Sequence, residues 1–336
     1  MKKTSTAYKL LTYLNDGKFH SGETLGQTLG ITRSAIWKIM QQLSHEGIEI
    51  ESAAGKGYRI LQGMELLNSS TLTQYFDQTT KNAVEELIIL DHIDSTNDYL
   101  LSLSHTHPRR SIACFAEYQT KARGRRGRSW VAPFGTNIYH SLLWHFDKDP
   151  SEIVGLSLAI GVAVQNTLKQ YGIKQDISLK WPNDVLWKGR KLAGILLEMT
   201  AEHHGTCSVV IGVGLNTYLP KKITTAIHQP WTDIYEITQS PPKRNQLAGL
   251  LLNNICQTLM TFEQQGLTPF ITVWRKLDTL IGKTVTLQMA NQQICGILQD
   301  ISEKGELILI HENGQVHRFL SGEISLRAMQ QEASLC

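Results

Sequence analysis

The sequence lacks the short motifs that identify many sites directly. Its five cysteines are scattered, with no C-x-x-C pair and no zinc-finger spacing to histidine, so we expect reduced thiols without a structural zinc. It contains neither G-x-x-x-x-G-K-[ST] nor a G-x-G-x-x-G that opens a helix, which argues against a P-loop or Rossmann nucleotide site. No Ser/His/Asp or Cys/His pattern suggests an enzyme nucleophile.

Long apolar runs are also missing. The longest, residues 153–164, is interrupted by Ser157 and is far shorter than a membrane span. Residues 1–16 are polar and basic, without the apolar core or cleavage site of a signal peptide. We therefore expect a cytoplasmic protein with no membrane partner. At 336 residues the chain is too long for one compact core, which predicts two or three domains.

The excess positive charge lies at one end of the chain. Residues 1–60 hold eight Lys/Arg against five Asp/Glu, whereas the remainder holds 25 of each sign. The net charge of +3 is therefore confined to the first sixty residues, where it would attract a polyanion.

That basic segment has the pattern of a winged helix-turn-helix domain, which we place at residues 1–62. Apolar residues repeat at helical spacing over 7–14, Ser21 can cap a second helix that Gly30 ends, and Thr32 can cap a third. Two β-branched runs between residues 48 and 60 then predict a hairpin wing.

This pattern predicts DNA binding, and the alternative is a small helical adaptor that binds protein. The side chains expected to contact DNA lie at the helix caps, on the solvent face of the third helix and at the wing tip: Ser21, Thr32, Arg33, Ser34, Trp37, Lys38, Gln41 and Lys56.

The rest of the chain predicts an α+β architecture. Residues 63–84 are polar and expected to form a linker with one short helix. Residues 85–268 alternate strands and amphipathic helices, often with short hairpins between strands, which favours a mixed sheet. Residues 269–336 predict a short helix and then short strands separated by turns, as in a small β-barrel.

The most unusual stretch is the arginine loop, residues 122–130, with the sequence ARGRRGRSW. Guanidinium groups and glycine backbone N–H groups can surround a phosphate, and Trp130 can stack on a base. Such a dense cationic loop is expected to be mobile until an anion binds. A basic localisation or RNA-binding tract is the alternative, which the position inside a neutral, strand-rich domain disfavours.

A second polar cluster follows at residues 180–184, KWPND, and 190–195, RKLAGI. A lysine here could bind a carboxylate or an α-phosphate, and Asp184 could hold Mg²⁺. The alternative is an exposed hairpin with ordinary charges. The turn 211–216, IGVGLN, is a weak signal by itself.

Together these segments resemble the bifunctional biotin–protein ligases that also act as biotin operon repressors. The resemblance spans the chain and includes residues 19–22 and 55–58, 94–97, 116–119, the arginine loop, 180–184, 190–195, 214–216 and 322–327. It implies a central biotin-ligase catalytic domain and a C-terminal SH3-like barrel.

The resemblance also implies ligands and their residues. Biotin would be bound by Ser95, Thr96, Asn97, Gln119, Arg123, Gly124, Arg125, Lys191 and Gly194. ATP and the adenylate would be bound by Arg123, Arg125, Arg126, Arg128, Trp130, Asn183, Asn216, Glu323 and Arg327. The residues expected to be catalytic are Lys180, Arg125, Asp184 and Lys191, with Asp184 also as the Mg²⁺ ligand.

The implied reaction forms biotinyl-5′-AMP and transfers biotin to a lysine of the biotin carboxyl carrier protein of acetyl-CoA carboxylase. With this adenylate bound as corepressor, a homodimer would bind operator DNA. A regulator with an inactive enzyme site and a lipoate-type ligase are the alternatives. One residue departs from the family pattern: Ala122 stands where the loop usually has glycine, which would restrict the backbone there.

Overall fold

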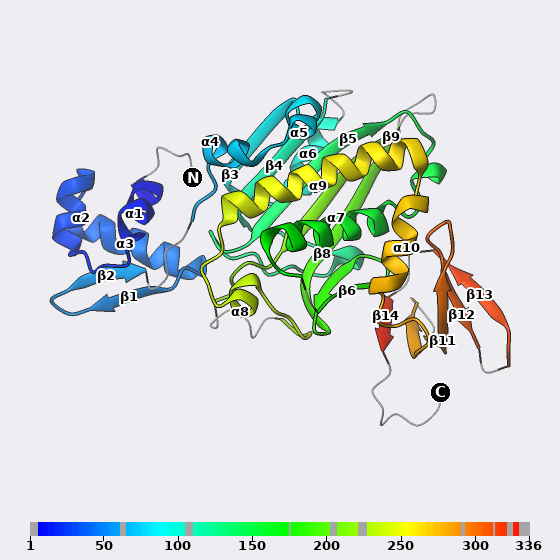
Figure 1. The fold of residues 1–336 in the computed structure, drawn as a ribbon. Helices are drawn as coiled ribbons and strands as arrows, with labels where there is room; N and C mark the ends of the chain where they lie inside the picture. The colour runs from blue at the N-terminus through cyan, green and yellow to red at the C-terminus, as the bar shows by residue number, and fades with distance from the viewer. Residues whose placement is uncertain are drawn as a thin grey trace.

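The computed structural model places three parts in a row, with a helical N-terminal part at one end and a small sheet at the other (Figure 1). The described residues are 6–60, 65–104, 110–174, 176–201, 207–220, 227–289, 293–311, 313–320 and 325–328.

The N-terminal part is a helix-turn-helix followed by a β-hairpin, as the sequence predicts. Its elements are α1 (Thr6–Leu14), α2 (Gly22–Leu29), α3 (Arg33–His45), β1 (Ile50–Ala53) and β2 (Gly57–Ile60). Both predicted caps are confirmed: the Ser21 side chain accepts from the backbone N–H of Thr24, and Thr32 accepts from that of Ala35. Gly30 ends α2 with a φ of 68°, which permits the tight turn into α3.

The central part is a seven-stranded mixed sheet in the order β3-β4-β5-β9-β8-β7-β6, in which only the β3–β4 pair is parallel. Its strands are β3 (Glu86–Ile93), β4 (Ile112–Gln119), β5 (Ile138–Phe146), β6 (Ile177–Lys180), β7 (Asp184–Trp187), β8 (Arg190–Ala201) and β9 (Cys207–Leu215). Its helices are α6 (Thr96–Ser104), α7 (Leu156–Tyr171), α8 (Ile234–Thr238) and α9 (Arg244–Gln265), with 3₁₀ turns η2 (Arg125–Gly127) and η3 (Pro150–Ile153).

Helices cover both faces of this sheet. Helices α7 and α9 lie side by side on one face (Figure 1), where Phe115 joins the main hydrophobic core. Helix α6 packs on the other, where Cys114 joins a smaller cluster with Leu100. Neighbouring residues of a strand therefore point into two different cores, because successive side chains lie on opposite faces of the sheet. Since helices cover both faces, polar side chains are expected mainly at the ends of the strands.

One helical stretch is more apolar than the sequence reasoning allowed. Pro150–Tyr171 is 22 residues long with a mean hydropathy of 1.3, enough to cross a membrane by length and composition. However, 67% of its apolar window is buried in the protein, and α7 contributes eleven buried residues. It is packed as the core helix of the central part.

The segment expected to be a linker is part of this core. It contains α4 (Ser69–Leu72), η1 (Thr73–Tyr75) and α5 (Gln78–Ala83), which pack against α9. Leu67 and Leu72 are 1% and 0% exposed. The polar composition concealed these contacts, because only a few apolar residues, such as Leu67 and Leu72, make them.

The C-terminal part is a five-stranded antiparallel sheet in the order β13-β12-β11-β10-β14. Its elements are α10 (Thr268–Leu277), β10 (Thr284–Gln288), β11 (Gln293–Ile301), β12 (Leu307–Ile310), β13 (Val316–Phe319) and β14 (Ser325–Ala328). Within the described ranges no pairing between β13 and β14 closes the sheet into a barrel.

The cysteines follow expectation in part. Cys114, Cys207 and Cys256 are free and buried, and burial raises the pKa of the Cys114 thiol to about 12. Cys336 lies outside the described residues.

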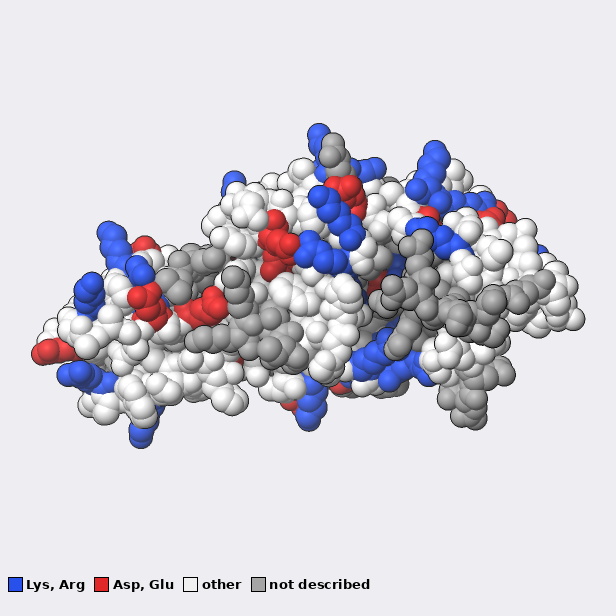
Figure 2. All heavy atoms as spheres, turned by 90° about the horizontal axis from the view of Figure 1, so that it is seen from below, with Lys and Arg blue, Asp and Glu red and all other residues white. Residues whose placement is uncertain are grey.

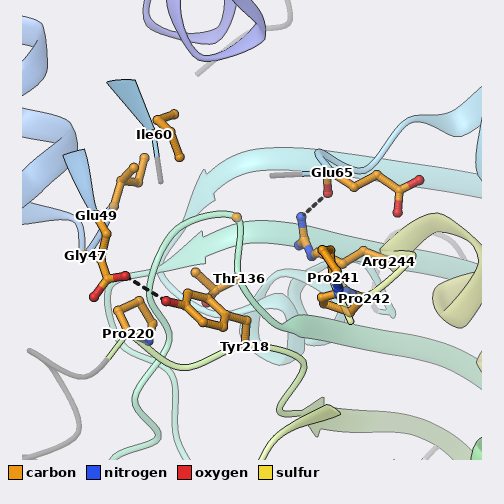
Figure 3. A pocket seen from close by; sticks show the side chains of 12 residues that line it. Gly47, Glu49, Ile60, Glu65, Thr136, Tyr218, Pro220, Pro241, Pro242 and Arg244 are labelled. Carbon is orange, nitrogen blue, oxygen red and sulfur yellow. Dashed lines mark hydrogen bonds between the residues drawn. The ribbon is translucent and has the colours of Figure 1, made fainter. Parts of the chain in front are cut away.

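The N-terminal part docks directly on segments of the central part. The Tyr218 hydroxyl donates to Glu49 at 2.7 Å across the crevice between them (Figure 3). His92 Nε2 lies 3.0 Å from Glu46, and the fully buried ring of Phe134 joins the N-terminal hydrophobic core. The chain between the arginine loop and β5 is therefore held by the N-terminal part.

Candidate functional site

A single cavity of about 880 Å³ gathers nearly all the residues expected to bind biotin and ATP. This size is typical of a small-molecule site. The expected residues that line it are Ser95, Thr96, Asn97, Gln119, Arg123, Gly124, Arg125, Arg126, Arg128, Trp130, Lys180, Asn183, Asp184, Lys191, Gly194 and Asn216. Glu323 lies outside the described residues; of Arg327 only the backbone is described, in β14, next to the cavity-lining Leu326.

Among the described residues that line the cavity, Lys191 and Asp184 form a close ion pair. Lys191 Nζ lies 2.7 Å from Asp184 Oδ1, and the two side chains are 16% and 18% exposed. They come from neighbouring antiparallel strands, since Lys191 is near the start of β8 and Asp184 begins β7. Partial burial strengthens the field of such charges on a bound substrate.

Trp130 forms one wall beside this pair. Lys191 Nζ lies 5.3 Å from the Trp130 ring centroid. The ring lies over Gly194 and Gly214, because a Cβ atom on either glycine would come within 2.9 Å and 2.8 Å of indole atoms. The buried Trp130 N–H has no hydrogen-bond partner in the described part of the chain. It can therefore donate to a ligand.

The arginine loop is a closed turn. The Trp130 N–H donates to Ala122 O at 2.9 Å, and the Gly124 N–H donates to Arg128 O at 2.7 Å. Positive φ values occur at Arg126 (59°) and Gly127 (68°), and Ala122 does not share them. The backbone restriction that we expected at Ala122 therefore does not arise.

The four arginines of the loop have different surroundings. Arg126 and Arg128 are exposed, and Arg126 donates to Gln288 O of β10 at 3.2 Å. Arg125 is partly buried and donates to Asn183 Oδ1 at 3.4 Å. Burial lowers the pKa of the Arg125 guanidinium, with smaller contributions from Arg126 and Arg128. A cation that burial destabilises gains from a bound anion.

The residues expected to bind the biotin rings form a buried hydrogen-bonded group. Gln119 Oε1 accepts from the Thr96 N–H at 2.8 Å. The Ser141 hydroxyl lies 2.7 Å from Thr96 Oγ1 and 2.6 Å from Asn97 Oδ1. Ser95, Thr96 and Asn97 are each at most 5% exposed. Such a fixed polar end suits a small polar ring system.

The remaining expected residues support the two edges of the cavity. Asn183 Nδ2 donates to Ile195 O at 2.7 Å and thereby ties the β6–β7 turn to β8. Asn216 Nδ2 donates to Thr232 O at 3.1 Å and to Lys191 O at 3.4 Å, so its amide nitrogen is engaged within the protein. Lys180 ends β6 at the cavity wall, and its backbone pairs with Asp184.

The side chains of the cavity could bind a magnesium ion only if a substrate supplied further ligands. The described residues contain no cluster of three or more His, Cys, Asp or Glu side chains that could bind a metal by itself. Asp184 is the one carboxylate among the described residues that line the cavity. One carboxylate combined with nucleotide phosphates is a common way of holding Mg²⁺.

Sequence reasoning missed several residues of this site. Ser141 and Glu198 connect the expected biotin residues, and Asp98 contacts Arg123. Trp231 pairs with the backbone of Lys191 from a loop with no motif. These residues lie far apart in sequence inside ordinary strands and loops, so no local signal marks them.

The surface expected to bind DNA is exposed. Thr32, Arg33, Ser34, Trp37, Lys38 and Gln41 lie on the open face of α3, and Lys56 is exposed at the hairpin turn. The hydroxyl of Ser21 is only partly exposed and caps α2. Figure 2 shows basic and acidic side chains interspersed on the N-terminal part, at the left, on the side seen there. This matches the modest charge of +3.

Known proteins match each of the three parts. The Biotin/lipoate A/B protein ligase family matches residues 89–216, an HTH domain matches 6–59, and the Biotin protein ligase C terminal domain matches 280–327. The chain is 38% identical over 330 residues to the bifunctional ligase/repressor BirA of Escherichia coli K12, covering 98% of this chain and 100% of that one.

Other relatives agree. Identity to the bifunctional ligase/repressor BirA of Bacillus subtilis is 30% over 320 residues, covering 92% of this chain and 94% of that one. The structure of biotin protein ligase from Aquifex aeolicus in complex with biotin and ATP has a TM-score of 0.61 and 30% identity, covering 73% of this chain and all of that one. The chain therefore belongs to the biotin–protein ligase family, among the bifunctional ligase/repressors with an N-terminal helix-turn-helix domain.

Proposed function

We propose that this protein is an ATP-dependent biotin–protein ligase and a biotin-responsive transcriptional repressor. The observation that carries the ligase half is the single cavity that joins the arginine loop, the Lys191–Asp184 pair and the buried polar group around Thr96. These are, respectively, an anion-binding loop, a charged centre for the reacting groups and a pocket for a small polar ring.

The first step joins biotin to the nucleotide. A carboxylate oxygen of biotin attacks the α-phosphorus of ATP, and the bond to the pyrophosphate leaving group breaks. Lys191 lies between the two reacting groups and neutralises their mutual repulsion, while Lys180 and Arg125 orient the phosphates. Asp184 would hold Mg²⁺, which neutralises phosphate charge when bound.

The second step transfers biotin to protein. The ε-amine of an acceptor lysine attacks the mixed anhydride, an amide forms, and AMP leaves with the bonding electron pair. No enzyme nucleophile is required, in agreement with the sequence. Closing the arginine loop over the adenylate would keep water from the anhydride. We propose the biotin carboxyl carrier protein of acetyl-CoA carboxylase as the acceptor.

One experiment separates this proposal from its two alternatives. The protein is incubated with ATP, Mg²⁺, an acceptor domain and either biotin or lipoate, and the acceptor mass is measured. We expect biotin addition and no lipoate addition. Lipoate addition would make the protein a lipoate-type ligase, and no addition of either group would leave a regulator with an inactive site.

For the repressor half we propose that residues 1–62 form a winged helix-turn-helix domain that contacts operator DNA through α3 and Lys56. The catalytic domain would extend to residue 268, and residues 269–336 would form an SH3-like barrel that brings Glu323 and Arg327 to the nucleotide. Because its proposed ligands are ATP, a carboxylase subunit and operator DNA, we propose that the protein works in the cytoplasm, without a membrane partner.

We predict that biotinyl-adenylate controls DNA binding through dimerisation. One helix-turn-helix with a charge of +3 neutralises few phosphates and should bind a half-site weakly. Pairing two copies on a palindrome supplies the missing affinity. Linkage requires the adenylate to tighten dimerisation by about 1–3 kcal/mol.

Two measurements, each made with and without biotin plus ATP, test whether the adenylate controls DNA binding. Sedimentation gives the oligomeric state, and titration with DNA selected from a random pool gives the DNA affinity. We expect the adenylate to shift the protein to a dimer and to raise DNA affinity. Equal assembly and equal DNA affinity in both states would remove the repressor half and leave the ligase.

We predict further that Arg125→Gly accelerates the escape of biotinyl-adenylate. Loss of a charged hydrogen bond of about 1.5–3 kcal/mol corresponds to roughly 10- to 100-fold faster release. Trapping of the escaped adenylate by free amines measures it, with Lys121→Ala as the control because Lys121 is 73% exposed and pairs with Asp94. An unchanged release rate would show that Arg125 does not hold the phosphate.

A further inference from the structure

Glu198 lies behind the cavity rather than in its lining. It comes from β8, seven residues after Lys191, and its side chain is 26% exposed. Its Oε1 and Oε2 atoms lie 2.7 Å and 3.0 Å from Arg123 Nη2 at the start of the arginine loop. Its Oε2 also accepts from Asn97 Nδ2 at 2.7 Å. One carboxylate thus contacts two residues from distant segments that both line the cavity.

These contacts extend the buried group at the biotin end into a continuous chain. Asn97 reaches Thr96 through the Ser141 hydroxyl, and Thr96 reaches Gln119. These hydrogen bonds run from Arg123 to Gln119, so every side chain in this series is fixed by at least one neighbour. Buried networks of this kind hold their members in one arrangement only when each polar group is satisfied.

The two contacts of Glu198 have different consequences. Its negative charge aligns the Asn97 amide, because the Nδ2 group donates to Glu198 and leaves Oδ1 to accept from Ser141. It also anchors the Arg123 guanidinium, whose second partner, Asp98, is 48% exposed and does not contact Asn97 among the hydrogen bonds of the described residues. Of the two carboxylates that contact Arg123 in the described part of the chain, Glu198 is therefore the one whose side chain also binds Asn97.

We propose that Glu198 is a positioning residue of the biotin subsite, which fixes Asn97 and the first arginine of the loop before substrate binds. This rests on the proposed function of the cavity. Glu198 acts through its two neighbours and has no role in the reacting groups at Lys191. Its loss therefore raises the KM for biotin and loosens the loop, while kcat stays close to that of the wild type.

Glu198→Gln tests the proposal, since it keeps the size and removes the charge. Loss of a charged hydrogen bond typically corresponds to a change of roughly 10- to 100-fold. We expect the KM for biotin to rise by about 10-fold or more, with kcat within about 3-fold of wild type. In the ligand-free protein, the loop N–H groups of Gly124 and Trp130, which donate to Arg128 and Ala122, should exchange with solvent about 10-fold faster.

Asp98→Asn is the matched control, because it removes the other carboxylate on Arg123 and leaves Asn97 in place. It should loosen the loop without an equal rise in the KM for biotin. If Glu198→Gln leaves both loop exchange and KM within about twofold of wild type, the proposal is wrong. Equal falls in kcat for both variants would also overturn it.

The exchange measurement needs no substrate. It therefore tests the positioning role of Glu198 separately from the proposed ligase activity. Faster loop exchange in Glu198→Gln, in a protein that fails to adenylate biotin, would retain the positioning role and reject the proposed ligase activity. If Glu198→Gln lowers the melting temperature, the double variant with Arg123→Gln decides. If Glu198 positions Arg123, the double variant changes the exchange of the loop N–H groups by less than the sum of the two single variants. If the two substitutions destabilise the protein independently, their effects on exchange add.

Discussion

Lys191→Ala is expected to lower the rate of biotinyl-adenylate synthesis by about 10²–10³-fold, with the fold unchanged. Lys191 lines the cavity and contacts both the Asp184 carboxylate and the Trp130 ring. In the proposed first step, a biotin carboxylate must approach a phosphate of the same sign. A fixed, partly desolvated cation between them lowers this repulsion most in the transition state.

The loss should appear in kcat as well as in the KM for biotin. A group that contributes equally to ground state and transition state would change KM alone. Pyrophosphate release measures the first step without an acceptor protein. Lys188→Ala is the matched control, because Lys188 lies in the preceding turn, is 57% exposed and pairs with Asp176 outside the cavity. Pyrophosphate release within a few-fold of wild type in Lys191→Ala would refute the role.

Much of the fold could be predicted because its signals are local. The caps at Ser21 and Thr32 and the left-handed Gly30 lie within a few residues of the groups they satisfy. The mixed sheet of the central part was predicted from runs of apolar residues that are often joined by short hairpins, and the structure has such a sheet. Such features need no knowledge of the rest of the chain.

Features that depend on distant contacts could not be predicted. Glu198 and Arg123 are 75 positions apart, and a single glutamate in a strand looks like a surface residue. Phe134 follows the arginine loop, yet its ring fills the N-terminal core. Leu67 is buried in a segment whose composition is that of a linker. In each case the deciding partner comes from another element.

The cavity residues form an intermediate case. The arginine loop and residues 180–184 were singled out by composition, but their meeting in one cavity was expected only from the resemblance to a family. The sheet explains part of it physically: β7 and β8 are antiparallel neighbours in which Asp184 pairs with Gly194 and Leu186 with Lys191, so the long Lys191 side chain can reach Asp184 across the pair.

The strongest effect on stability is expected at the buried pair of Arg244 and Glu117, which are 2% and 1% exposed. Arg244 Nη2 lies 2.7 Å from Glu117 Oε2 and donates to Asn137 O, and Nη1 donates to Glu65 O at 2.7 Å (Figure 3). One guanidinium thus joins α9 to β4, to the chain before β5 and to the residues that precede α4.

Arg244→Met should lower the free energy of unfolding by about 3–5 kcal/mol, because it leaves the Glu117 charge buried without its partner. Urea denaturation without ligands measures the loss. Arg110→Met is the control, since Arg110 is 41% exposed in its pairs with Glu85 and Glu86 and should change stability by at most about 1 kcal/mol. Adding Glu117→Gln to Arg244→Met should restore part of the loss by removing the unpaired charge. If the double variant is less stable than Arg244→Met alone, the buried charge is not the cause, and the lost hydrogen bonds to Asn137 and Glu65 account for the effect.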